Sequence, residues 1–171
     1  MPTNVWFVGT ANNDDSTFTI TDKVYDRATP IQLNTKASAF ECEDSGPIQI
    51  KSSYLQDLFR EAKEKHQVSQ ELLDKLEELD FYMVKNFRLA FGNRIMKQIK
   101  DFIPVYVACG GSELAGLDYM LTYKILKKIE NPNIALIRDN LKGLTGHFEK
   151  VFGEGTMPHA RAYIERIINI S

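Results

Sequence analysis

The stretch Ser69–Leu79, SQELLDKLEEL, decides the class of fold. Its apolar residues recur at spacings of three and four, and they are Leu72, Leu73, Leu76 and Leu79. This spacing is the period of an α-helix with one buried face. Ser69 stands directly before the pattern, where its hydroxyl can cap the first turn. The stretch therefore predicts an amphipathic helix that packs against a core and runs on past Asp80 or restarts near Phe81.

The same helical pattern extends over most of the chain from Ser53 onward. Ser53-Tyr-Leu-Gln56 has the form of a capping box, and it predicts a helix to about Lys65. Gly110-Gly111 breaks the pattern, and Ser112 can cap the helix that follows. Further helices are expected from Gly92-Asn93, from Ser112, from Ile134 to about Phe152 and from Pro158 to Ile168.

The first fifty residues have a different character. They are rich in Val, Ile, Thr and Phe, with turn residues between the apolar runs, which favours strands and loops. We expect strands at Asn4–Val8 and Pro30–Leu33 and one short helix near Asp22 to Arg27. The predicted fold class is therefore α+β, mainly α, with a few N-terminal β-strands followed by a multi-helix bundle. The predicted domains are 1–50 and 51–171.

Composition and charge argue against several classes of protein. A net charge of −2 gives no overall basic field of the kind that nucleic-acid binders usually have. Cys42 and Cys109 lie far apart, and the three histidines show no metal-ligand spacing, so no metal site is expected. Free thiols are typical of a reducing compartment. No apolar run approaches the roughly 18 residues of a membrane span. We expect a cytoplasmic protein without membrane contact.

Three short motifs together resemble a known family. They are GTAN at Gly9–Asn12, DKVYDRA at Asp22–Ala28 and FGNRIMKQI at Phe91–Ile99. In this order they look like sensor 1, the arginine-finger helix and the sensor 2 helix of the lid in the C-terminal part of an AAA+ ATPase module. Within that family they most resemble the branch that contains the motor subunit of methylcytosine-dependent restriction systems and its dynein-like relatives. The likeness covers residues 4 to about 130.

The resemblance implies a role for three residues. Asn12 would orient the water that attacks the γ-phosphate, Arg27 would reach the nucleotide of a neighbouring subunit, and Arg94 would bind the nucleotide of its own subunit. Simpler interpretations stay open: Asn12 satisfies its own turn, Arg27 forms a surface ion pair with a nearby acid, and Arg94 lies on a solvated helix face. Relatives often have two adjacent arginines at the finger, whereas Arg27 follows Asp26 here.

The chain departs from the family in lacking the phosphate loop. It contains no G-x-x-x-x-G-K-[ST] motif and no apolar strand ending in Asp-Glu that could hold magnesium. By itself it is expected to hold no cofactor and to hydrolyse no nucleotide; ATP or GTP with Mg would belong to a full-length parent that assembles as a ring. We therefore expect a C-terminal fragment of a longer motor protein. Its unpaired strands could join two copies in a symmetric dimer.

Two functions from other classes stay open. One is a helical interaction module, an adaptor that binds protein partners without nucleotide. The other is a nucleic-acid-binding domain. Its contact surface would be the basic stretch of Lys85, Arg88, Arg94, Lys97 and Lys100.

Overall fold

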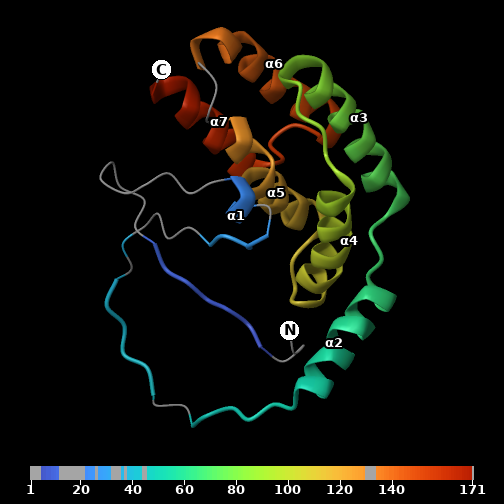
Figure 1. Cartoon of the computed structure of the whole chain (residues 1–171), viewed down its shortest axis with the longest axis vertical. Coiled ribbons are helices and arrows are strands. Elements are labelled where there is room, and N and C mark those ends of the chain that lie inside the picture. Colours follow the sequence, from blue (N-terminus) through green and yellow to red (C-terminus); the bar gives the residue numbers. More distant parts are fainter. Residues whose placement is uncertain are drawn as a thin grey trace. The chain divides into compact units, whose positions relative to one another are not determined.

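The computed structural model describes residues 5–11, 22–25, 27–31, 36, 38–43, 46–129 and 134–170. The chain divides into two compact units, residues 1–61 and 62–171. Figure 1 shows its elements, which are α1 (Asp22–Tyr25), α2 (Ser52–Lys65), α3 (Gln70–Phe87), α4 (Asn93–Ala108), α5 (Glu113–Lys124), the 3₁₀-helix η1 (Leu126–Ile129), α6 (Ile134–Phe152) and α7 (Pro158–Ile170).

The expected N-terminal strands are wrong. No strand occurs among the described residues, so the fold is helical rather than α+β. Residues 5–11 have no regular structure, and the side chains of Trp6, Phe7 and Val8 are 64%, 79% and 93% exposed. A strand is stable only when a neighbouring strand pairs with its backbone N–H and C=O groups, and the described part of the chain offers none. The short helix expected near Asp22 is present as α1.

Most helix boundaries after residue 51 lie where the sequence predicts them. Ser69 caps α3 by accepting a hydrogen bond from the Leu72 amide, and Ser112 caps α5 by accepting from the Ala115 amide. Gly110 adopts a φ of 94°, in the left-handed region that favours glycine, and separates α4 from α5. The first cap is an exception, because α2 already begins at Ser52. Local capping chemistry thus accounts for where these helices begin and end.

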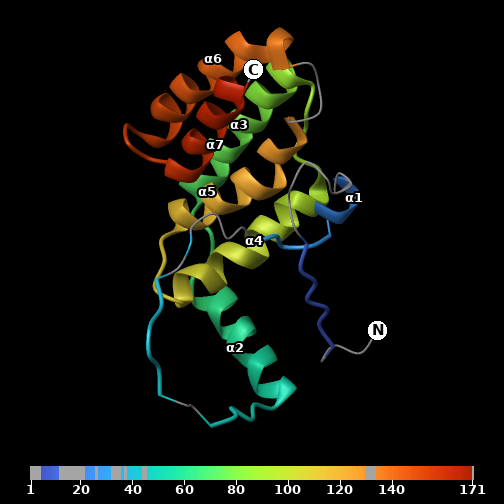
Figure 2. The ribbon, with the colours of Figure 1, turned by 90° about the vertical axis from the view of Figure 1, so that its left-hand side faces the viewer.

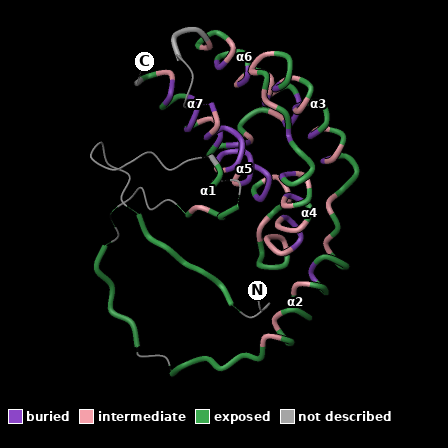
Figure 3. The backbone as a smooth tube through the Cα atoms, viewed as in Figure 1, coloured by how far each residue is buried: buried purple, intermediate pink, exposed green. Residues whose placement is uncertain are grey.

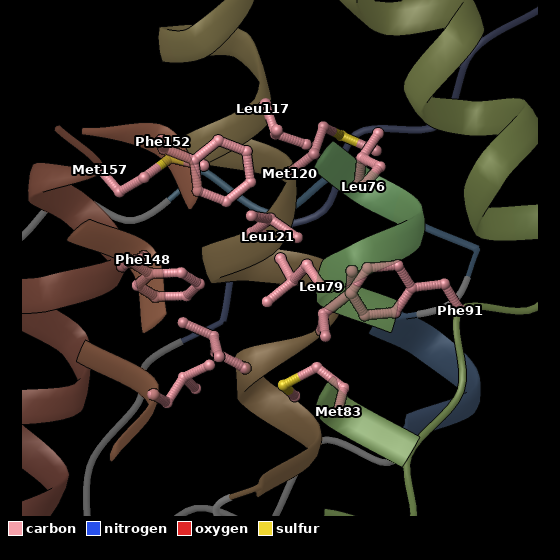
Figure 4. Close-up of a cluster of buried hydrophobic side chains, with 14 of the residues drawn as sticks. Leu76, Leu79, Met83, Phe91, Leu117, Met120, Leu121, Phe148, Phe152 and Met157 are labelled. Atoms are coloured by element: carbon pink, nitrogen blue, oxygen red, sulfur yellow. The ribbon is translucent and has the colours of Figure 1, made fainter. Parts of the chain in front are cut away.

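The helices of residues 62–171 share one apolar core. α5 packs against α4 and α7, while α6 packs against α7 and α3, an arrangement that can be followed in Figure 2. Figure 4 shows side chains from α3, α5 and α6 meeting in this core, among them Leu76, Leu121 and Phe148, each no more than 1% exposed. Burying one such side chain contributes roughly 1.5–3 kcal/mol. The core therefore fixes the positions of the helices that carry the exposed basic residues of α4.

An aromatic row joins α4 to α5. The ring of Phe102 lies 5.6 Å from that of Tyr106 and 5.6 Å from that of Tyr119, and Tyr119 in turn lies 4.6 Å from Tyr123. Burial raises the pKa of Tyr119, and the neighbouring hydroxyls of Tyr123 and Tyr106 raise it further. Gly111 makes room for this row, because a Cβ atom there would lie 2.2 Å from the Tyr106 ring.

Candidate functional site

The connection between α3 and α4 holds the start of α4 in a fixed place. Arg88 ends α3 in the left-handed conformation, with a φ of 54°, and its amide donates to the Val84 carbonyl at 3.0 Å. Asp80 accepts a hydrogen bond of 2.6 Å from the backbone amide of Phe91. The Phe91 side chain is itself buried, at 6% exposed. This carboxylate and this ring therefore anchor the connection to the core.

The first turn of α4 is open to an anion. Its N-cap, Gly92, has an extended backbone and no side chain that could accept from the first amides of the helix. The first turn, Asn93–Met96, contains no acidic residue. The side chain of Arg94 is exposed within it, on the side of the helix away from buried Ile95 and Ile99. The amides of Ile95 and Met96 donate to the Gly92 carbonyl, which leaves those of Asn93 and Arg94 for an anion. These two amides, the positive end of the helix dipole and a guanidinium together favour a phosphate or carboxylate.

More basic residues follow Arg94 along the exposed side of α4. Lys97 and Lys100 are both exposed, as the sequence pattern requires for either a solvated face or a phosphate-facing one. Asp101 lies two turns beyond Arg94, where its carboxylate accepts from Lys63 Nζ at 2.7 Å. Because this acid already has a basic partner, it neutralises less of the positive charge around Arg94.

The other two predicted site residues, Arg27 and Asn12, do not belong to residues 62–171. Arg27 is exposed directly after α1, and its amide donates to the Val24 carbonyl at 3.0 Å. It belongs to residues 1–61, whereas Arg94 belongs to residues 62–171. Asn12 lies outside the described residues. The structure therefore describes the local surroundings of two of the three predicted residues.

The described residues contain neither a cluster of metal ligands nor a membrane-spanning helix. Within them, no group of three or more His, Cys, Asp or Glu side chains could hold a metal ion. No helix in the described part of the chain is long and apolar enough to cross a membrane. Cys42 and Cys109 are both free and exposed.

Three acidic residues that sequence reasoning did not single out position the helices. Asp80 anchors the connection before α4, as described above. Glu113 accepts from the Ser69 hydroxyl at 2.6 Å and from the Ser69 amide at 3.0 Å, which ties the start of α5 to the start of α3. Asp118 is 1% exposed and binds the first turn of α7. For Asp118 the sequence gives a signal, because a lone acid among apolar residues such as Leu117 and Met120 must find a buried partner.

The fold and the site together define a class of helical domain. In it, the exposed and basic N-terminus of α4 follows a loop that is anchored to the core. Residues 41–170 match the family model described as Domain of unknown function (DUF8727), and the chain belongs to that family. No curated protein and no solved structure matches the chain.

Proposed function

We propose that this chain acts in an AAA+ nucleoside-triphosphatase of the motor-subunit type, to which it contributes a lid-type helical domain and the arginine that responds to nucleotide. The single observation that supports the proposal best is the position of Arg94. It is exposed in the first turn of a helix whose N-cap is a glycine, on a loop held by Asp80 and Phe91. The cytoplasm is the compartment we propose, where exposed thiols such as Cys42 and Cys109 stay reduced.

In the proposed mechanism, Arg94 links the nucleotide to the helical unit, which is residues 62–171. Its guanidinium donates two parallel hydrogen bonds to phosphate oxygens, and the first amides of α4 bind the same anion. Because the start of α4 is tied to α3 through Asp80, loss of the terminal phosphate releases the helical unit as a whole rather than one side chain. The lid then moves as hydrolysis proceeds.

The rest of the nucleotide site comes from outside the described residues. A phosphate loop and a magnesium site are supplied by another segment or chain of the parent, with ATP or GTP as the nucleotide. Arg27 acts as the finger toward a neighbouring subunit of a ring, and Asn12 orients the attacking water. Without those parts, this chain binds a free triphosphate only weakly and does not hydrolyse it.

A nuclear magnetic resonance titration of the full chain with ATP tests the proposal. ATP is expected to bind with a dissociation constant of roughly 1 mM or weaker, and to shift the amide signals of Asn93, Arg94 and Ile95 first. Arg94→Ala should abolish these shifts, whereas the matched variant Lys142→Ala, an exposed lysine of α6, should leave them intact. Shifts centred elsewhere, or micromolar affinity, would contradict the proposed site.

Turnover in a complete module tests the three roles separately. Asn12→Ala, Arg27→Ala and Arg94→Ala should each lower the rate of hydrolysis, and loss of an arginine finger should cost about 10³-fold or more. In mixed assemblies an intact neighbour should restore the site that lacks Arg27, whereas Asn12→Ala should fail within its own site. A wild-type rate for Arg27→Ala would remove the finger assignment.

A titration with single-stranded DNA separates this proposal from nucleic-acid binding. If the basic face including Lys97 and Lys100 binds DNA, the affinity should fall steeply as salt is raised. Such a result, without ATP-dependent shifts at Arg94, would favour the nucleic-acid function instead.

A further inference from the structure

On the side of α3 that points away from the core, acidic, apolar and basic residues follow one another along the chain. We call this side the α3 outer face; its members are Asp74, Glu77, Glu78, Phe81, Val84, Lys85 and the C-cap residue Arg88, which directly follows the helix, all exposed. Exposed residues recur along α3 in Figure 3. The residues opposite them on the helix are the buried Leu72, Leu76, Leu79 and Met83.

The centre of this face is apolar. Phe81 is 71% exposed and Val84 45% exposed, and they are the large apolar side chains of residues 62–171 that lie open in the described structure. At positions i and i+3 they are neighbours on the helix surface. Covering a largely exposed phenylalanine with the apolar surface of a partner lowers the free energy of the complex.

Charge is divided across this centre. The acidic residues Asp74, Glu77 and Glu78 precede Phe81, and the basic residues Lys85 and Arg88 follow it. Glu78 already forms an ion pair of 3.7 Å with Lys150 of its own chain, so Asp74 and Glu77 are the acids left for a second copy. When two copies of the helix lie antiparallel about a twofold axis through Phe81, each acidic half faces the basic half of the other copy. In that arrangement Lys85 approaches the partner's Glu77 and Arg88 approaches the partner's Asp74. The same face is therefore complementary to itself.

A parallel pairing or an unrelated partner fits less well. Parallel alignment would place acid beside acid and base beside base, which is unfavourable. A uniformly acidic or basic partner would match one half of the face and repel the other. The charge order thus selects a second copy of this chain in antiparallel orientation.

We propose that the α3 outer face is a homodimer contact, formed by antiparallel pairing of α3 from two copies around Phe81. The predicted N-terminal strands, through which a dimer was expected, are not present in the described structure, and α3 supplies a different surface. Because one helix face is a small interface, the dimer is weak, with a dissociation constant of roughly 10 µM to 1 mM.

Sedimentation equilibrium of the full chain over this concentration range tests the contact. The wild-type chain should show a reversible monomer–dimer equilibrium that weakens as salt is raised. Phe81→Asp should raise the dissociation constant by at least about tenfold, because it removes the apolar centre and brings two carboxylates together. The control Tyr54→Asp changes an aromatic residue of α2 that is 56% exposed, and it should leave the equilibrium unchanged.

A charge exchange tests the antiparallel register. Lys85→Glu with Arg88→Glu makes the face wholly acidic, and Asp74→Lys with Glu77→Lys makes it largely basic. Each double variant alone should be monomeric, and an equal mixture of the two should form heterodimers, because every pair across the twofold axis is then of opposite charge. Lys142→Glu, at an exposed lysine of α6, controls for a change in net charge.

Three outcomes would overturn the proposal. They are a wild-type chain that stays monomeric at about 1 mM, a dimer that survives Phe81→Asp, and charge variants that fail to associate when mixed. Circular dichroism of each variant shows whether α3 is still folded, since all the substituted side chains are exposed and should leave the core intact.

Discussion

Replacing Asp118 by alanine should destabilise the helical unit more than any change on its surface. Asp118 lies in α5 and is 1% exposed. Its two carboxylate oxygens accept from the backbone amides of His159 and Ala160, each at 2.8 Å. These amides belong to the first turn of α7, which has no partners for them within the helix. One side chain therefore joins α5 to α7 and caps α7 at the same time.

The size of the effect follows from these two hydrogen bonds. A hydrogen bond to a charged group contributes roughly 1.5–3 kcal/mol, and the negative charge at a helix N-terminus adds about 0.3–1 kcal/mol. Asp118→Ala also leaves the Ala160 amide buried without its acceptor. We expect a loss of about 3–5 kcal/mol in the free energy of unfolding. Asp118→Asn keeps one acceptor oxygen and should cost about half as much.

Urea unfolding followed by circular dichroism at neutral pH measures both losses. Asp139→Ala serves as the matched control, because Asp139 is exposed on α6 and its replacement should change stability by no more than about 0.5 kcal/mol. If the Asp118→Ala variant proves unfolded, the Asp118→Asn variant still gives a measurable shift in the urea unfolding curve. A loss below about 1 kcal/mol for Asp118→Ala would refute the reasoning, since it would mean that α7 does not depend on this carboxylate.

Two further predictions concern helix contacts. His147 stacks on Tyr82 at 4.1 Å, and burial lowers the pKa of His147 below its ordinary value of 6.5 in spite of Glu78, while Lys150 lowers it further. Below about pH 6.5 the unfolded chain takes up a proton that the folded chain resists, so stability should fall there, and His147→Phe should remove that part of the pH dependence in urea titrations. Gly111→Ala should cost about 1–3 kcal/mol, because its Cβ would overlap the Tyr106 ring, and a double-mutant cycle with Tyr106→Ala should show most of that cost disappearing.

The sequence predicted the helices well because their signals are local. Ser69 and Ser112 cap helices through atoms three residues away, and the leucine spacing of α3 depends only on the pitch of a helix. The prediction of N-terminal strands was wrong because a strand depends on pairing with another strand and not on its own sequence alone. The run Val5–Val8 has the composition of a buried strand, but its pairing depends on neighbours that the described residues do not supply.

The candidate site shows the same division. The opening of α4 at Asn93 and the exposure of Arg94 follow from a Gly-Asn pair and a helical period. The anchoring of that helix does not, because Asp80 reaches the Phe91 amide eleven residues away across the end of α3. The tie between Glu113 and Ser69 joins residues that are forty-four positions apart. Tertiary hydrogen bonds of this kind need coordinates.

The proposed anion site and the proposed dimer contact meet at the end of α3. Arg88 is the last member of the α3 outer face and also the residue that ends α3 before the connection to α4. Pairing two copies through Arg88 would further restrain the anchored segment that precedes Arg94, and an anion at Arg94 would restrain the same segment from the other side. If the two events are coupled, thermodynamic linkage requires that dimerisation change ATP affinity by the same factor by which ATP changes dimerisation. Equal affinities of monomer and dimer for ATP would instead mean that Asp80 and Phe91 hold the connection rigid enough to keep the two surfaces independent.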